Sequence, residues 1–258
     1  MVFSSFVFLL LFLPVVTALS MLVRPVRGKN LILFAFSMLF YAWGEPVYVL
    51  LMLASILVNY AVGLGLGRAE RPAARKALMA AALVFDLGCI IVFKYADLLL
   101  SSFGAVTGLA VPTLGLALPI GISFYTFQIL SYVIDVYRGR VAVQRDLLSL
   151  GTYIALFPQL VAGPIVRYET LEHELRERTV TRDGFMDGLC RLAMGLGKKV
   201  LLANAMGCIA DAVFDGTVSG GAVTVLGALA YTLQICLDFS GYSDMAIGMG
   251  RMLGFTFP

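Results

Sequence analysis

Long apolar segments recur along this chain, and they limit the folds that it can adopt. A transmembrane helix needs about 20 consecutive apolar residues, within a range of about 17–25. Seven segments approach or match that length: 6–23, 31–43, 47–66, 78–100, 118–137, 185–214 and 222–250. Hydrophobic residues make up 60% of the 258 positions and charged residues 14%, whereas soluble domains carry about 45–50% and about 25%. We therefore expect an all-α, polytopic transmembrane bundle, and we exclude a soluble enzyme, a disordered chain and a nucleic-acid-binding domain.

The distribution of basic residues predicts the orientation of these spans. Four loops (24–29, 68–76, 138–145 and 167–182) hold 14 of the 19 Lys and Arg residues, whereas the segments 44–46, 101–117 and 215–221 hold none. Because basic loops remain in the cytoplasm, we expect about seven crossings with the N-terminus outside. Three basic residues follow the first apolar segment and none precedes it, which is the reverse of a secretory signal. The uncharged segment 101–117 is expected to be a loop or a shallow surface segment.

Residues 147–166 differ from the other apolar segments because prolines interrupt them. Pro158 and the pair Gly163 and Pro164 fall inside the segment, and the residue before a proline is disfavoured in a helix. Basic clusters flank the segment on both sides, so a single crossing would place one cluster on the wrong side of the membrane. We therefore expect a re-entrant segment that enters the bilayer and returns, with its broken backbone surrounded by protein or a water-filled cavity.

Polar side chains recur along the last apolar segment at helical spacing. Tyr231, Gln234, Asp238 and Gly241 or Tyr242 share one helix face, and Ser240 and Asp244 share another. Polar groups at membrane depth are costly and usually face a cavity or a partner. Two interpretations remain open: a polar stripe that lines a tunnel for a polar substrate, or a structural network that joins this helix to its neighbours.

Other charged residues inside apolar segments are expected to have structural partners. Lys94 and Asp97 are three residues apart and can pair on one helix face, and the same holds for Asp135 and Arg138. The adjacent lysines 198–199 lie near the middle of a long apolar segment. They either extend to a headgroup layer or face a cavity that holds an anionic donor.

The search for a self-contained catalytic or metal site in this chain is negative. The sequence has no GxSxG, HExxH or Walker lysine motif. Its one histidine, His173, lies in a polar stretch that we expect to be an exposed cytoplasmic loop. Four cysteines lie in apolar stretches without CxxC spacing, and we expect buried thiols rather than disulfides or metal ligands: Cys89, Cys190, Cys208 and Cys236.

A set of motifs occurs in order over nearly the whole chain. They are MVFSS (1–5), FYAWGEP (40–46), LPIGISFYTFQ (118–128), YVIDVYR (132–138), FPQLVAGPIVRY (157–168), GLGKK (195–199) and DFSGYSDMAIG (238–248). Together they resemble the membrane-bound O-acyltransferase family, in its alginate O-acetyltransferase branch. The resemblance implies that the helical bundle is part of the fold of that family.

The resemblance also implies an activity and its participants. Such proteins move an acyl group, usually acetyl, from a cytoplasmic donor to hydroxyls of an extracytoplasmic polysaccharide such as alginate. The donor, acetyl-coenzyme A or a carrier thioester, is then a substrate, and no bound cofactor or metal is expected. Expected partners are the lipid bilayer of the bacterial cytoplasmic (inner) membrane, the polysaccharide and periplasmic acetyltransferase proteins. The alternative is a transporter or flippase component for an activated acyl group or glycan, since broken helices and intramembrane carboxylates suit transporters too.

The resemblance suggests where the substrates pass. The donor entrance at the re-entrant segment is expected to involve Gln159, Gly163, Pro164 and Arg167, with Arg167 near donor phosphates. The tunnel is expected to be lined by Gln234, Asp238, Ser240, Tyr242 and Asp244. The essential histidine of the family lies beyond the part that matches 238–248, and His173 does not correspond to it. We therefore expect residues 1–258 to form one membrane-embedded domain that is truncated at its C-terminus and inactive alone, with no catalytic residue of its own.

Overall fold

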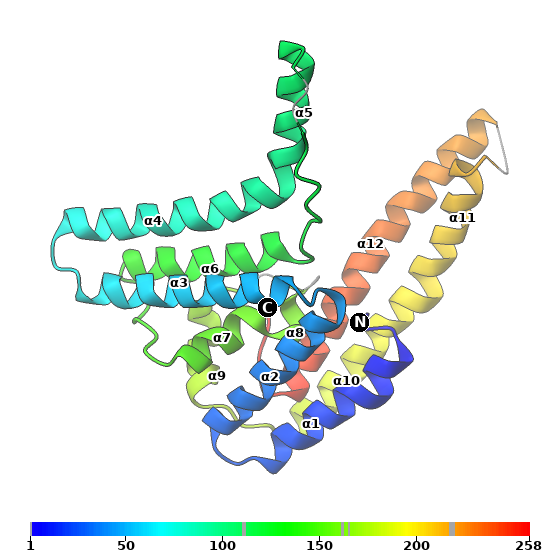
Figure 1. The fold of residues 1–258 in the computed structure, drawn as a ribbon. Coiled ribbons are helices and arrows are strands. Elements are labelled where there is room, and N and C mark those ends of the chain that lie inside the picture. Colours follow the sequence, from blue (N-terminus) through cyan, green and yellow to red (C-terminus); the bar gives the residue numbers. More distant parts are fainter. Residues whose placement is uncertain (1, 110–111, 161–162, 165, 217–219) are drawn as a thin grey trace. The chain divides into compact units, whose positions relative to one another are not determined.

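The computed structural model describes residues 1–258 except 1, 110–111, 161–162, 165 and 217–219. Every regular element in this described part is a helix (Figure 1), which confirms the all-α prediction. The chain divides into two compact units. Unit 1 contains residues 1–32, 162–164 and 177–258, and unit 2 contains residues 33–161 and 165–176.

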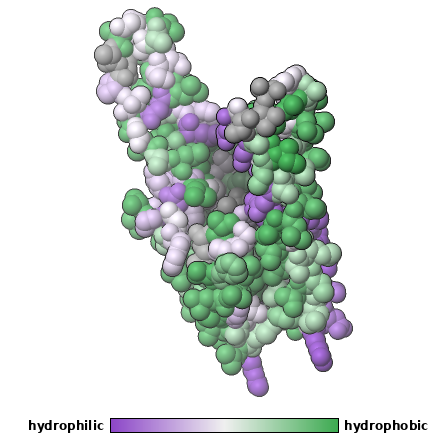
Figure 2. All heavy atoms as spheres, turned by 90° about the vertical axis from the view of Figure 1, so that its right-hand side faces the viewer, coloured by the Kyte–Doolittle hydropathy of each residue, from purple (hydrophilic) through white to green (hydrophobic). Residues whose placement is uncertain are grey.

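Four helices are long and apolar enough to cross a membrane. They are Tyr48–Arg68, Pro72–Thr107, Arg182–Phe214 and Gly221–Met252, and a shorter apolar helix spans Phe8–Leu22. Large apolar side chains lie exposed on them, such as Leu50 at 69%, Val84 at 75% and Leu201 at 71%. Figure 2 agrees, since hydrophobic side chains cover most of the face that it draws. Because so much exposed apolar surface requires contact with lipid, the chain is a membrane protein, as predicted. The count of about seven spans and the outside N-terminus stay predictions.

Unit 2 is a helical bundle in which α3, α4 and α6 contact one another. Its elements are the C-terminal part of α2 (Val26–Gly44), α3 (Tyr48–Arg68), α4 (Pro72–Ile90), the π-helical turn η2 (Ile91–Tyr95), α5 (Ala96–Thr107), α6 (Ile122–Tyr137), α7 (Leu147–Ala155), α8 (Phe157–Leu160) and α9 (Tyr168–Arg176). Helices α3 and α6 approach closely at Gly63, where a Cβ would lie 2.9 Å from the Tyr132 hydroxyl. Arg75 ties the ends of these helices together, because it donates to the carbonyls of Leu66 (2.7 Å) and Tyr137 (2.8 Å).

Helix α5 extends further than the sequence predicts. The segment 101–117 is expected to be a loop or surface segment, but its first seven residues continue the helix as far as Thr107. The helix ends at Gly108, which has a φ of +70°. A glycine in this left-handed conformation is a common helix stop. The loop prediction is therefore wrong for 101–107, because apolar residues at a membrane surface extend a helix as readily as they form a shallow loop.

The carboxylate of Asp97 holds the segment that follows α5. It accepts hydrogen bonds from the backbone N–H groups of Leu114 (2.6 Å) and Gly115 (3.1 Å). The Nζ of Lys94 instead lies 5.4 Å from the centroid of the Tyr95 ring. The expected Lys94–Asp97 pair is therefore wrong, because two backbone donors from a returning segment occupy the carboxylate.

Buried polar side chains also join the helices of unit 2. Asn59 of α3 donates to Asp86 of α4 at 2.9 Å, and both side chains are at most 2% exposed. The positions of Asn59 and Asp86 in the sequence do not predict this pair. Asp135 is 5% exposed, and among the described residues it forms no ion pair with Arg138. The expected helix-end pair is wrong, because the Asp135 side chain turns into the bundle.

Unit 1 contains an N-terminal helix and a long helical hairpin. Its elements are η1 (Phe8–Phe12), α1 (Leu13–Leu22), the start of α2, α10 (Arg182–Gly197), the π-helical segment η3 (Lys198–Ala203), α11 (Asn204–Phe214) and α12 (Gly221–Met252). Helix α12 contacts α10, η3 and α11 along its length. The chain therefore forms a hairpin in which one long apolar helix packs against three consecutive helical segments.

Small residues let α10 and α12 approach each other closely. A Cβ at Gly188 would lie 2.6 Å from the Gly248 carbonyl oxygen, and a Cβ at Gly195 would lie 2.6 Å from the Gly241 carbonyl oxygen. The two glycines on each helix are seven residues apart and so lie on the same face. Such close backbone contact is how small residues stabilise helix pairs in membranes.

Arg178 anchors the segment that leads into α10. It is 6% exposed and donates to the Asn30 side chain at 2.5 Å. Its guanidinium lies 4.5 Å from the centroid of the Phe255 ring. An arginine that the charge pattern assigns to a cytoplasmic loop is thus a buried link between the start of α2, this segment and the C-terminal residues.

Candidate functional site

A charged seam joins α10 and η3 to α12 in unit 1. We use this name for six residues: Arg191, Lys198, Lys199, Asp238, Ser240 and Asp244. The Asp244 carboxylate accepts from Arg191 Nε at 3.0 Å and from Lys198 Nζ at 2.5 Å. Lys198 Nζ also donates to the Ser240 hydroxyl at 3.1 Å. Six residues earlier on α12, Asp238 Oδ1 lies 2.8 Å from Lys199 Nζ.

The local backbone explains how two adjacent lysines reach the same helix. Neighbouring residues on an α-helix point about 100° apart, so one of them would ordinarily face away from α12. Lys198 and Lys199 begin the π-helical segment η3, where the wider turn changes the side-chain directions. The neighbouring contact between Gly195 and Gly241 also brings the two backbones together. Both lysines therefore engage α12, at carboxylates six residues apart.

The seam carries a surplus of positive charge. Three cationic side chains, Arg191, Lys198 and Lys199, face two carboxylates. The Asp244 side chain is 17% exposed and that of Lys198 is 39% exposed, so the pairs are partly desolvated. Charges of this kind in a membrane protein need partners, and an unpaired one is costly. The arrangement can hold an additional anionic group against the cations.

The aromatic residues beside the seam come from both ends of unit 1. Lys199 Nζ lies 5.6 Å from the centroid of the Tyr242 ring. The Phe3 ring contacts the same tyrosine at a centroid distance of 5.8 Å. Cation–π contacts and ring contacts of this type hold the ammonium in place. The N-terminal residues therefore support the Lys199 side of the seam.

The remaining residues of the predicted stripe lie further along α12. Gln234 is half-buried opposite Gly207 of α11, where a Cβ would lie 2.9 Å from its Nε2. Tyr231 is 51% exposed and contacts the ring of Phe214. The contacts of Asp238, Ser240 and Asp244 match the structural network that the sequence left open as one interpretation. A tunnel-lining role for these residues and for Gln234 and Tyr242 stays a prediction.

The apolar segment 147–166 has a broken backbone, as predicted, but the break lies one residue earlier than the proline argument places it, because Phe157 before Pro158 is helical. Helix α7 ends at Ala155, Leu156 has a ψ of 111°, and the short helix α8 follows. The end of the segment includes positions 161, 162 and 165, which lie outside the described residues. The depth of the segment in the membrane stays a prediction.

Gln159 is buried in unit 2 against a glutamine of α6. Gln128 Nε2 donates to Gln159 Oε1 at 2.8 Å, and both residues are 2% exposed. Within the described part of the chain, the other amide atoms, Gln128 Oε1 and Gln159 Nε2, have no hydrogen-bond partner. Gln159 is one of the predicted entrance residues, whereas Gln128 is not. The sequence did offer a signal for Gln128, because this residue is the last one of the motif at 118–128.

Three buried tyrosines and a glutamine also contact one another around the segment 147–166 and the residues that follow it. The Tyr168 ring contacts the rings of Tyr132 and Tyr153 at centroid distances of 4.8 and 5.2 Å. Gln144 donates to the Tyr168 hydroxyl at 2.8 Å, and the Tyr153 hydroxyl donates to the Val166 carbonyl at 2.9 Å. Burial raises the pKa of the Tyr168 hydroxyl, so it remains neutral. We call Gln128, Tyr132, Gln144, Tyr153, Gln159 and Tyr168 the amide–tyrosine cluster.

The other predicted entrance residues have different surroundings. Arg167 is exposed, next to the buried Tyr168 in unit 2. Gly163 is buried and Pro164 is half-buried, and both belong to unit 1. Arg167 and the pair Gly163 and Pro164 therefore belong to different units. Their role at an entrance stays a prediction.

His173 lies on a helix rather than in a loop. Helix α9 buries Tyr168, Leu171 and Leu175 on one face and forms an ion pair between Glu172 and Arg176 at 2.9 Å. His173 itself is exposed, as predicted. The loop prediction is wrong because apolar residues at helical spacing lie hidden among the charges.

The described residues contain no group of three or more His, Cys, Asp or Glu side chains that could hold a metal ion. The cysteines are free thiols, as expected. Cys190, Cys208 and Cys236 are exposed, so the prediction of buried thiols is wrong for these three. An apolar residue of a membrane helix does not need protein around it, because lipid provides an equally apolar environment.

Curated proteins that are similar to this chain agree with its motifs. Along its whole length the chain is similar to curated proteins named as alginate O-acetylases and, at lower identity, as a peptidoglycan O-acetyltransferase, which confirms the resemblance seen in its motifs. It is 43% identical over 262 residues to the probable alginate O-acetylase AlgI of Azotobacter vinelandii, and 43% identical over 267 residues to that of Pseudomonas aeruginosa. It is 28% identical over 291 residues to the peptidoglycan O-acetyltransferase of Helicobacter pylori.

These alignments cover 100% of this chain but only 52%, 50% and 55% of the respective relatives. The chain thus spans about half the length of the curated relatives it matches. No family model matches the chain.

Proposed function

We propose that this chain belongs to a membrane enzyme that transfers an acyl group, acetyl in the first instance, to hydroxyls of an extracytoplasmic polysaccharide such as alginate. The observation that carries the proposal is the 43% identity to alginate O-acetylases over the whole chain. More distant relatives are named as a peptidoglycan O-acetyltransferase and a teichoic acid D-alanyltransferase. All of these names describe acyl transfer to a cell-surface polymer, so a transporter without chemistry is not favoured.

The charged seam and the donor fit each other in charge. An acyl donor such as acetyl-coenzyme A or a phosphopantetheine carrier brings phosphates, and the seam has one positive charge in excess. Arg167 is exposed and available to phosphates at the predicted entrance. We propose that Arg167 in unit 2 binds donor phosphates. For unit 1 we propose separately that the seam lysines attract anionic groups and that Gln234, Tyr242 and the seam line a substrate path.

The proposed setting is the bacterial inner membrane, with basic loops in the cytoplasm and the polysaccharide outside. Periplasmic acetyltransferase proteins are the proposed partners of such an enzyme. Acyl transfer requires a base that accepts the proton of the attacking hydroxyl. Within the described residues of this chain, His173 is exposed on α9 and outside the seam, so we propose no catalytic role for it.

The test is polymer-linked O-acetyl in a strain from which the gene has been deleted. Complementation with the reading frame that encodes this chain, including any extension, is expected to restore O-acetyl. The same frame with Lys198→Met is expected to restore at least tenfold less at equal membrane abundance. Asp183→Asn is the matched control, because Asp183 is exposed at the start of α10. Polymer acetylation that is unchanged in the deletion strain, or that is not restored by the expressed frame, would contradict the proposal.

A further inference from the structure

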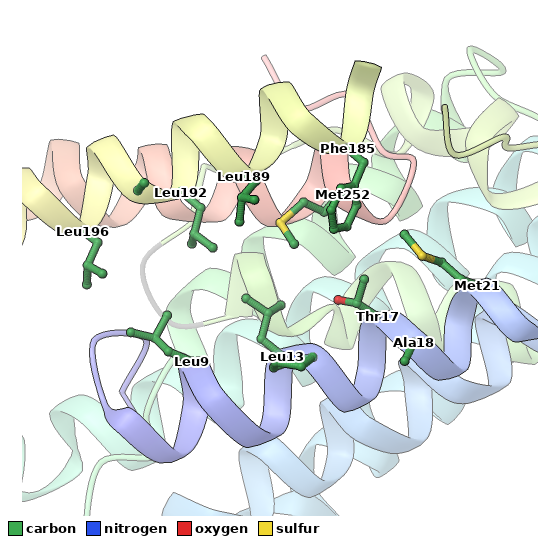
Figure 3. A pocket seen from close by; sticks show the side chains of 12 residues that line it. Leu9, Leu13, Thr17, Ala18, Met21, Phe185, Leu189, Leu192, Leu196 and Met252 are labelled. Atoms are coloured by element: carbon green, nitrogen blue, oxygen red, sulfur yellow. The ribbon is translucent and has the colours of Figure 1, made fainter. Parts of the chain in front are cut away.

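An apolar groove separates α1 from α10 in unit 1. It has a volume of about 570 Å³ and is lined on one side by α1 residues such as Leu13 and Ala18, and on the other by α10 residues such as Leu192 and Ala193. Met252 of α12 also contributes. Figure 3 shows the side chains of both helices pointing into the space between them. We call this feature the α1–α10 groove.

The groove has a defined direction and length. Leu9 faces Leu196 at one end, and Met21 lies near Phe185 at the other (Figure 3). The two helices therefore run antiparallel. A helix rises about 1.5 Å per residue, so the twelve steps from Leu9 to Met21 span roughly 18 Å. The hydrocarbon core of a bilayer is about 30 Å thick, so the groove is about as long as one leaflet is deep.

One end of the groove is strongly basic. Arg24 lies three residues beyond Met21, and Arg182 lies three residues before Phe185, so both are at the same end. Both side chains are exposed. Arg27 and Lys29 follow Arg24, whereas Asp183 is the nearest acidic residue in sequence to Arg182. The N-terminal end of α10 adds a partial positive charge at this end. A narrow apolar groove thus opens at a cationic mouth.

We propose that the α1–α10 groove holds one acyl chain of a membrane phospholipid, with the lipid phosphate at Arg24 and Arg182. The lipid comes from the leaflet on the side of the basic loops. A phospholipid combines the two features that the groove requires, an apolar chain one leaflet long and an anion at its end. A protein helix in the same place would need a carboxylate at the mouth to avoid leaving the two arginines desolvated without a partner. The site lies apart from the charged seam and is independent of the proposed function.

The first experiment identifies the occupant directly. A photo-crosslinking amino acid replaces Ala193, which lines the groove and is exposed, and cells are irradiated before the protein is purified. The expected product is a phospholipid adduct detected by mass spectrometry. Leu11 is the matched control position, since it is 62% exposed on the same unit but does not line the groove. We expect at least fivefold less adduct of a single lipid class there. A crosslink to a second copy, or to another segment of the same protein, would overturn the proposal.

The second experiment measures the contributions of the acyl chain and of the headgroup to lipid binding separately. Purified protein is stripped of lipid, supplied with phosphatidylglycerol and examined by native mass spectrometry. Ala18→Trp fills the groove and is expected to reduce the bound fraction at least fivefold, whereas Leu11→Trp leaves it unchanged. Replacing both mouth arginines by Gln (Arg24→Gln, Arg182→Gln) is expected to reduce the bound fraction of phosphatidylglycerol at least threefold. The bound fraction of diacylglycerol, which lacks the phosphate, is expected to stay unchanged.

Thermal unfolding of each variant distinguishes lost binding from lost folding. A variant that melts like the parent protein and binds less lipid supports the proposal. Equal retention of phosphatidylglycerol by folded Ala18→Trp and Leu11→Trp proteins would overturn it. If Ala18→Trp does not fold, the crosslink at Ala193 and the arginine variants still decide the question.

Discussion

The charged seam and the amide–tyrosine cluster differ in the kind of polar side chain that joins their helices. Both place polar side chains between helices of a membrane protein. The seam uses ions that remain partly exposed, with Asp244 at 17% and Lys198 at 39%. The cluster uses neutral groups that are almost completely buried, with Gln128 and Gln159 at 2% and Tyr153 at 0%.

The difference follows from the cost of burial. A buried ion without a partner loses several kcal/mol of hydration, whereas a neutral amide or hydroxyl loses about 1–3 kcal/mol. Each carboxylate of the seam therefore has a cationic partner. In the cluster, by contrast, two amide atoms lack a partner among the described residues. The charged residues therefore determine which helices pack together. The neutral cluster keeps two amide atoms that can still form hydrogen bonds.

The largest expected effect tests the close contact that forms the seam. Gly195→Leu would place a Cβ 2.6 Å from the Gly241 carbonyl oxygen and 2.7 Å from the Met245 nitrogen. These backbone atoms cannot move aside, so we expect a loss of about 3 kcal/mol in unfolding free energy. Gly197→Leu is the control on the same helix, because nothing lies within 4 Å of a Cβ there. Unfolding in detergent measures both, and equal melting of the two variants would contradict the close contact.

The next effect concerns the ions of the seam. Asp244→Asn removes the partner of Arg191 and Lys198 and is expected to cost about 2 kcal/mol, less than a fully buried pair because the lysine is partly exposed. Adding Lys198→Met to Asp244→Asn is expected to recover part of the loss, since one unpaired charge is removed. A double-mutant cycle from thermal melts measures the coupling. Simple additivity of the two changes would show that the pair does not contribute to stability.

In the neutral cluster, Tyr153→Phe removes the donor to the Val166 carbonyl and leaves that buried acceptor without it. The expected cost is about 1.5 kcal/mol. Tyr95→Phe is the control, because that ring is 40% exposed. If both changes shift the melting temperature equally, the Tyr153 hydrogen bond is not a support of the broken segment.

The smallest effect addresses the paired amides. Gln159→Leu alone leaves Gln128 unsatisfied and is expected to cost about 1 kcal/mol. Replacing both glutamines by Leu is expected to be close to neutral in stability, because no buried polar atom is left without a partner. Polymer-linked O-acetyl is then measured in cells that express the stable double variant. Loss of acetylation would indicate that the amides serve a substrate, and unchanged acetylation would indicate a structural role.

The membrane class was predictable because it depends on local composition. Apolar runs of about 20 residues require lipid whatever the rest of the chain does, and the four long helices confirm them. A break near Pro158 was predictable because a proline disfavours helix at the residue before it, but the extended residue is Leu156, and Phe157 already belongs to α8. The family resemblance was also visible in the sequence, because its motifs are contiguous.

The partners of individual side chains were not predictable. Lys94 and Asp97 have the right spacing for a pair, yet Asp97 instead binds the backbone of Leu114 and Gly115. Arg191 was not singled out, although it shares Asp244 with Lys198. In each case the partner comes from a segment distant in the chain, and the sequence does not show which distant segment comes close.

The apolar runs and the motifs are sufficient to predict a helical membrane protein, a break within 147–166 and the family that the chain resembles. These properties follow from interactions of each segment with its solvent and with its own backbone. The contacts of Lys198 and Lys199 with α12, the contact of Gln128 with Gln159 and the groove between α1 and α10 depend instead on how the helices pack. These contacts do not follow from the sequence because a polar or small side chain in a membrane is compatible with many neighbours. The packing of the helices selects one of them.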